Sequence, residues 1–127
     1  MVWNLDADRP IYAQLVEQLQ LQIISGQYPP GGKLPSVREL AAEAAVNPNT
    51  MQKAFAELER GGLIITQSTN GRMVTGDTDL IRRSRLMLAR KHVDAFFNGM
   101  RGLGYTRAEA MDALKSMRGG TADESFD

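Results

Sequence analysis

The stretch VNPNTMQKAFAELERGGLI, residues 46–64, decides the fold. Asn47 is a typical helix N-cap, and Pro48 suits the first helical position, where a missing N–H costs nothing. Apolar residues then recur at helical spacing until Gly61-Gly62, which ends the predicted helix. Its inner face is predicted to consist of Met51, Ala54, Phe55 and Leu58.

A shorter helix is predicted directly before this one. Ser36-Val37-Arg38-Glu39 matches a capping box, in which the Ser36 and Glu39 side chains each bind the other residue's backbone N–H. Two short helices joined by a tight turn form a helix-turn-helix, and the second helix of that motif can enter a DNA major groove.

The outer face of the second helix is polar over its first two turns. Asn49, Thr50, Gln52 and Lys53 have no evident structural role there. Asn and Gln can each form two hydrogen bonds to adenine, and Lys can contact a phosphate or a guanine. A merely solvated helix face is the alternative; Asn47, by contrast, is explained by capping alone. In the helix-turn-helix context we interpret the four side chains as DNA-reading.

A β-hairpin is predicted next. Asn70-Gly71 lies between the β-prone segments 63–67 and 72–76, and Asn-Gly favours a tight hairpin turn. A hairpin that follows a helix-turn-helix is a wing. Upstream, apolar residues every four positions predict a helix from Pro10, placed at its first position, to a stop at Gly26.

The C-terminal part is predicted to hold two more helices. The first runs from about 79 to 100, where Gly99, Gly102 and Gly104 break it, and a second capping box at residues 106–109 opens the last helix. We therefore expect a mainly α chain with a small β-hairpin wing. Its parts would be a DNA-binding domain at 1–76, a two-helix dimerisation region at 77–118 and a flexible tail at 119–127.

Two helices cannot enclose a core by themselves, so their apolar side chains predict a homodimer. An effector pocket lined by Met and Phe is the alternative use of the same residues. The side chains expected in the dimer surface are Leu80, Met87, Leu88, Phe96, Phe97, Met100, Met111 and Leu114.

Composition excludes several classes of protein. The 127 residues include no cysteine and one histidine, His92, so neither thiolate nor histidine metal sites are expected. No phosphate-binding loop, cofactor site or catalytic group of residues is evident, and we expect no enzyme. No apolar run approaches the roughly 18 residues of a membrane span, and no signal peptide is evident, so a cytoplasmic protein is expected.

The net charge gives no indication of a nucleic-acid partner. Fifteen basic residues balance fifteen acidic ones. A DNA-binding surface would therefore depend on where individual charges lie rather than on a general positive field. A winged module that binds another protein instead of DNA is the competing hypothesis, although the polar face of residues 49–53 lacks the apolar anchors of such a surface.

The order of short motifs resembles one family closely. The motifs are P-I-Y-x-Q at 10–14, I-x-S-G-x-Y at 23–28, G-x-K-L-P-S-x-R-E-L-A at 31–41, V-N-P-N-T at 46–50 and L-E-R-x-G-L-I at 58–64. Over residues 7–76 they resemble the winged-helix domain of GntR transcriptional regulators. The short C-terminal part looks like that of the YtrA subfamily, which implies dimerisation and repression of operons that encode ABC-type transporters.

The resemblance also implies DNA contacts at particular positions. Arg38 matches the family's DNA-contacting arginine, and Ser36 lies beside it in the same motif. In the recognition helix, Pro48 stands where many relatives outside this subfamily have arginine, which excludes an arginine–guanine contact there. At the wing, Asn70, Gly71 and Arg72 are the candidates for minor-groove or phosphate contacts. A two-fold dimer would require a pseudo-palindromic double-stranded operator. The sequence identifies no small-molecule effector.

Overall fold

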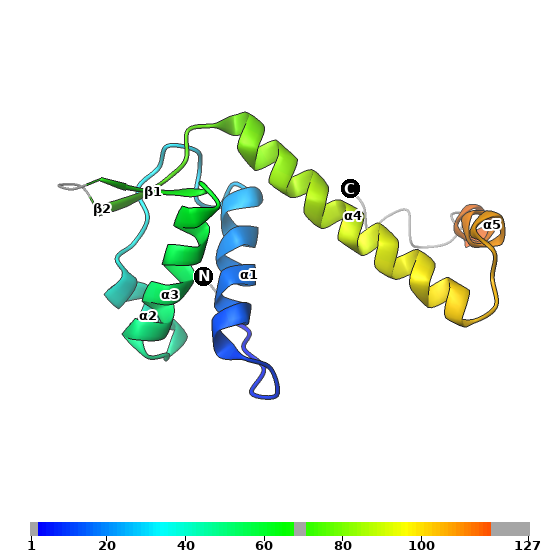
Figure 1. The fold of residues 1–127 in the computed structure, drawn as a ribbon, viewed down its shortest axis with the longest axis horizontal. Coiled ribbons are helices and arrows are strands. Elements are labelled where there is room, and N and C mark those ends of the chain that lie inside the picture. The colour runs from blue at the N-terminus through cyan, green and yellow to red at the C-terminus, as the bar shows by residue number, and fades with distance from the viewer. Residues whose placement is uncertain (1–2, 68–70, 118–127) are drawn as a thin grey trace. The chain divides into compact units, whose positions relative to one another are not determined.

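The computed structural model describes residues 3–67 and 71–117. Within them it is mainly helical, with one two-stranded antiparallel hairpin (Figure 1). The elements, in order, are α1 (Ile11–Ile24), α2 (Val37–Ala44), α3 (Pro48–Arg60), β1 (Ile64–Gln67), β2 (Gly71–Val74), α4 (Thr78–Gly102) and α5 (Arg107–Met117). This confirms the predicted winged helix-turn-helix followed by two helices.

The chain divides into two compact units, residues 1–85 and 86–127. The first unit contains the winged helix and the opening turns of α4. Its division from the second lies inside α4 rather than at residue 76, because Ile81 is buried in the first unit's core and Arg85 donates to the Ile24 carbonyl at 2.8 Å. The domain roles inferred from the sequence stay predictions.

The core of the first unit lies between α1, α2 and α3. Leu15, Leu19, Phe55 and Met51 are fully buried at its centre, and Leu40 joins them from α2. The predicted inner face of α3 is confirmed, since each of its four residues is at most 5% exposed. Burying this face directs the opposite side of α3 outward, where residues 49, 52 and 53 are exposed.

Local side-chain bonds set the helix starts. Ser36 Oγ accepts from the Glu39 N–H at 3.0 Å and Asn47 Oδ1 accepts from the Asn49 N–H at 2.8 Å, as the sequence predicts. The capping box at Thr106 is also confirmed. Pro10 differs from its prediction: its extended ψ of 127° makes it the N-cap, so α1 begins one residue later.

Two glutamines of α1 bind the segment before the helix. The Gln14 side chain is 2% exposed and holds the Asp6 backbone through both its N–H and its carbonyl, each at 2.6 Å. Gln18, one turn later, binds the Asn4 backbone in the same two-sided way at 3.3 and 2.9 Å. Buried amides need such partners, and here they attach the N-terminal segment to α1.

The wing is attached to the start of α2 by backbone hydrogen bonds. In the hairpin, Ile64 pairs with Val74 and Gln67 with Gly71. On its other edge, β2 exchanges bonds with residues 32–34: Leu34 N–H donates to the Arg72 carbonyl and Val74 N–H to the Gly32 carbonyl, each at 2.9 Å. The wing is therefore fixed to the segment that leads into α2.

Helix α4 is longer than predicted. It continues through Gly99 and ends at Gly102, since one glycine in a helix costs only about 1 kcal/mol and does not by itself end it. None of the helices in residues 3–67 and 71–117 is long and apolar enough to cross a membrane.

The turn of the helix-turn-helix contains a strained residue. Ala45 has φ 57° and ψ 46°, and Val46 N–H donates to the Ala41 carbonyl at 3.0 Å, which closes the end of α2. The equivalent bond after α3, from Leu63 N–H to the Leu58 carbonyl, is closed around Gly62. Left-handed backbone is costly for any residue with a Cβ.

We therefore predict that Ala45→Gly stabilises the protein. Relief of the left-handed strain should exceed the added chain entropy of glycine, leaving a gain of roughly 0.5–1 kcal/mol in the free energy of unfolding. Urea denaturation measures it. Ala42→Gly, at an exposed position inside α2, is the control and should cost about 1 kcal/mol. Equal losses for both variants would contradict the assignment of strain to Ala45.

Candidate nucleic-acid interface

The polar face of α3 lies on the surface at the helix's N-terminal end. Asn49, Gln52 and Lys53 are exposed and Thr50 is half-buried. The Asn47 cap and Pro48 begin the helix immediately before them, while Met51 anchors the same turn in the core. Side chains that can donate and accept hydrogen bonds are therefore held on a rigid element.

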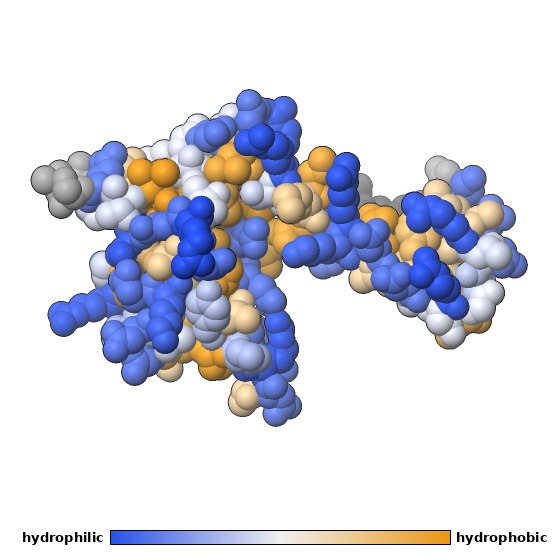
Figure 2. Space-filling model, in the orientation of Figure 1, coloured by the Kyte–Doolittle hydropathy of each residue, from blue (hydrophilic) through white to orange (hydrophobic). Residues whose placement is uncertain are grey.

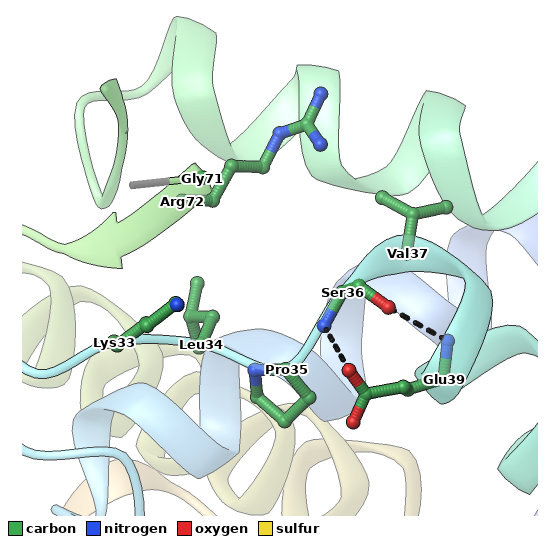
Figure 3. A pocket seen from close by; sticks show the side chains of 8 residues that line it. All are labelled: Lys33, Leu34, Pro35, Ser36, Val37, Glu39, Gly71 and Arg72. Atoms are coloured by element: carbon green, nitrogen blue, oxygen red, sulfur yellow. Dashed lines mark hydrogen bonds between the residues drawn. The ribbon is translucent and has the colours of Figure 1, made fainter. Parts of the chain in front are cut away.

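The start of α2 lies beside the wing. Ser36 and Arg38 are both exposed there, and Arg38 has no ion pair among the described residues. A pocket of about 310 Å³ separates this helix start from β2; in Figure 3 the bonded Ser36–Glu39 pair lies at one side and Gly71 and Arg72 lie across from it. The structure thus brings predicted residues of α2 and the wing together.

Lys33 lines the same pocket and was not singled out from the sequence as a contact residue. It is exposed, and its ammonium has no acidic partner among the described residues. Its location depends on the pairing of residues 32–34 with β2, a non-local contact. The signal available in the sequence was its place in the K-L-P-S motif.

Over residues 3–67 and 71–76, the basic residues fall into two groups. Arg9, Arg60 and Arg72 are ion-paired with Glu17, Glu57 and Glu59 respectively. Lys33, Arg38 and Lys53, in contrast, have no ion pair among the residues described, and they occupy the pocket rim, the start of α2 and α3. Although the net charge is near zero, Lys33, Arg38 and Lys53 therefore keep positive charges that no neighbouring acid neutralises.

Arg72 is engaged inside the protein rather than extended from it. Its Nε donates to Glu59 Oε1 at 2.7 Å, and its guanidinium lies 5.4 Å from the centre of the Phe55 ring. Gly71, before it, is exposed with φ +74°. Asn70, the third wing candidate, lies outside the described residues.

The Arg72 bond also controls the ionisation of Glu59. The hydrogen bond from Arg72 lowers the pKa of Glu59 below its ordinary value of 4.5; partial burial raises it by less, and a hydrogen bond from Thr66 lowers it further. The carboxylate is thus stabilised by groups from both strands of the wing, because Thr66 and Arg72 are cross-strand partners.

Among the residues predicted for a dimer surface, Leu80 lies in the winged unit, where it packs against the core and its Cδ2 approaches Gly62. In the second unit, Phe96 and Phe97 pack edge to face with ring centres 5.2 Å apart. Leu88, Phe96, Phe97 and Met100 are half-buried, whereas Met87, Met111 and Leu114 are exposed. Leu86, Val93 and Leu103 are exposed apolar residues that the sequence reading did not select.

The lowered pKa of Glu59 predicts an acid-sensitive contribution to stability. A carboxyl whose pKa is lowered in the folded state contributes its full stabilisation at a pH above its pKa in the unfolded chain, near 4.5. This contribution to the free energy of unfolding is lost as the pH falls through the pKa of the folded state. Glu59→Gln should therefore cost about 1 kcal/mol near pH 7 and progressively less below pH 4.5. Urea unfolding from pH 7 to pH 3 measures this difference.

Glu17→Gln is the matched control for that series. It removes an ion pair in which both side chains are more than half exposed, so its cost should be small at every pH. Parallel curves for the parent and Glu59→Gln across the whole range would contradict the proposed linkage.

Comparison with known proteins agrees with this geometry. The model of "Bacterial regulatory proteins, gntR family" matches residues 11–74. The HTH-type transcriptional regulator YhcF of Bacillus subtilis is 32% identical over 117 residues, which is 92% of this chain and 97% of that protein. The HTH-type transcriptional repressor YtrA of the same species is 38% identical over 100 residues, covering 72% of this chain and 75% of that one.

Solved structures show the same fold. A GntR family transcriptional regulator from Listeria monocytogenes has a TM-score of 0.82 at 35% identity, covering 89% of this chain and 99% of that one. The DNA-binding domain of AraR, in complex with its operator ORX1, has a TM-score of 0.51 at 27% identity, covering 59% of this chain and 93% of that one. These relatives are transcriptional regulators and not enzymes. The chain belongs to the GntR family of bacterial regulatory proteins, in its YtrA subfamily, and is a DNA-binding transcriptional regulator.

Proposed function

We propose that this regulator is a homodimeric repressor that reads a pseudo-palindromic operator with α3. One observation carries the proposal: α3 buries one face completely and exposes hydrogen-bonding side chains on the other, over its first turns. The AraR domain, which shares the fold, is solved in complex with its operator, and this supports DNA as the partner of this chain.

Base reading falls to the first turns of α3. Asn49 and Gln52 carry amides that can bind adenine through two hydrogen bonds, and Lys53 can bind a guanine or a phosphate. Thr50, which is half-buried between them, suits a phosphate or a thymine methyl group. Asn47 does not belong to this group, because its side-chain oxygen already accepts the Asn49 N–H.

Phosphate binding is assigned to the cations that have no acidic neighbour. Lys33 and Arg38 flank the start of α2 with both charges exposed. Ser36 and the wing residue Gly71 line the pocket between the start of α2 and β2, together with Lys33. The exposed backbone of Gly71 allows close approach to a DNA strand. These contacts hold the protein in register without specifying sequence.

Dimerisation is inferred from the second unit. Among residues 86–117, Ala110 is the one buried side chain, while large apolar residues of α4 and α5 are exposed; apolar surface is visible along both helices in Figure 2. A unit with so little core of its own requires a partner to remove this surface from water. The surface includes Met87, Met111 and Leu114, but Leu80 is left out because it already packs in the first unit.

Repression is proposed because YtrA, a relative similar over most of both chains, is a transcriptional repressor. A repressor that covers its operator needs no catalytic group and no cofactor. The subfamily resemblance further implies that the regulated operon encodes an ABC-type transporter.

The function is tested by selection from a random double-stranded DNA pool. The purified protein should retain an inverted repeat with half-sites about one helical turn, roughly 34 Å, apart. Genomic matches to that repeat then identify the regulated operon. A folded, dimeric protein that enriches no sequence at low salt would contradict the proposal.

A salt titration of binding to the selected duplex should distinguish residues that contact phosphates from residues that contact bases. Lys33→Ala and Arg38→Ala should each reduce the slope of log K against log [salt] by about 0.9. Gln52→Ala should keep the parent's slope but lose discrimination at one base pair, by roughly 1–3 kcal/mol. Unchanged slopes for both cation variants would show that neither residue contacts a phosphate.

The dimer surface should be sensitive to one charge. Leu114→Glu places a carboxylate among the exposed apolar residues of α5, and we expect it to convert the dimer to a monomer in light scattering while the helical signal is retained. Leu21→Glu is the control, because Leu21 is similarly exposed, at 52% against 49%, but lies on α1. Loss of the dimer in both variants, or in neither, would argue against the proposed surface.

A further inference from the structure

The contact between the wing and the second half of α3 suggests a role for Arg72 other than DNA contact. Its guanidinium is held by the Glu59 carboxylate at 2.7 Å and lies over the Phe55 ring. Both ionic side chains are only partly exposed, Arg72 at 25% and Glu59 at 31%. Thr66, on the neighbouring strand, also helps to lower the pKa of this carboxyl.

Arg72 also lies where three segments meet. Its carbonyl accepts from Leu34 N–H, next to the start of α2, and its backbone pairs with Thr66 in β1. Its side chain reaches α3, and Figure 3 shows it extending away from the Lys33 segment. Arg72 thus connects the wing to α3 through its side chain and to the segment before α2 through its carbonyl.

We propose that Arg72 is a positioning residue: through Glu59 and Phe55 it fixes the wing against α3, so that Gly71 and the Lys33–Ser36 segment approach the DNA in one orientation. The proposal rests on the DNA-binding function described above. It reassigns the phosphate contact that the sequence suggests for Arg72, since a guanidinium that binds a phosphate must first leave the carboxylate and the ring.

Glu59→Ala gives opposite results under the two roles. If Arg72 positions the wing, loss of Glu59 releases it, and the Kd for the selected duplex should rise about tenfold, equivalent to roughly 1.4 kcal/mol. If Arg72 binds a phosphate, loss of Glu59 frees the guanidinium and removes a negative charge, so the Kd should stay the same or fall. Binding is measured well below the melting temperature of each variant, which separates positioning from a general loss of stability.

The salt slope and an exchanged pair complete the test. Arg72→Ala should raise the Kd by a similar factor with the parent's slope retained, whereas loss of a phosphate contact would reduce that slope by about 0.9. The double variant Arg72→Glu with Glu59→Arg restores an ion pair in reverse, and its Kd should return to within about threefold of the parent. Glu17→Ala, which removes a paired carboxylate on α1, should leave the Kd unchanged.

A measurement without DNA separates the two proposals. In thermal unfolding, Arg72→Ala and Glu59→Ala together should lower Tm by less than the sum of the single variants, because each already breaks the same contact. Additive losses overturn the role of Arg72 whether or not the protein binds DNA. If the Tm losses of the variants are coupled but the parent protein enriches no DNA sequence, the contact between Arg72 and Glu59 is confirmed. The DNA-binding function is then overturned, and the positioning role with it.

Discussion

The burial of one face of α3 is the constraint on which the rest of the structure depends. Phe55 and Met51 are fully buried against α1 and α2, and at roughly 1.5–3 kcal/mol for each large apolar side chain such burial outweighs any single polar contact on the surface. Once that face is fixed, the rotation of the helix is fixed with it. The outward direction of Asn49 and Gln52 is therefore a consequence of the core.

Electrostatics acts here through placement rather than quantity. The acids of the winged unit are largely occupied: Glu39 caps α2, Glu57 binds Arg60 and Glu59 binds Arg72. Over residues 3–67 and 71–76, the cations without an ion pair are Lys33, Arg38 and Lys53, and all three are exposed. A balanced protein can thus present a local positive surface, and its weak overall field limits attraction to DNA in general.

Local chemistry is what the sequence predicted well. The caps at Ser36 and Asn47 and the inner face of α3 require only residues a few positions apart, and the structure confirms them. Contacts between distant segments were not predictable in this way. The Arg72–Glu59 bond depends on how the hairpin folds back on α3, and the location of Lys33 depends on pairing with β2. The roles proposed for Asn49, Gln52 and Lys53 follow from side-chain chemistry and from the resemblance, because no local pattern specifies a DNA contact.

Gln14 and Gln18 of α1 fix the spacing of the segment that precedes the helix. Gln14 and Gln18 lie four residues apart, about 6.0 Å along the helix, and they bind the backbones of Asp6 and Asn4, which are two residues apart. These bonds are made to main-chain atoms, so they do not depend on the side chains at positions 4 and 6, although Asp6 Oδ1 separately accepts the Asp8 N–H at 2.9 Å. The number of residues between the two positions cannot change, since inserting or deleting one would leave the buried Gln14 amide without its partner.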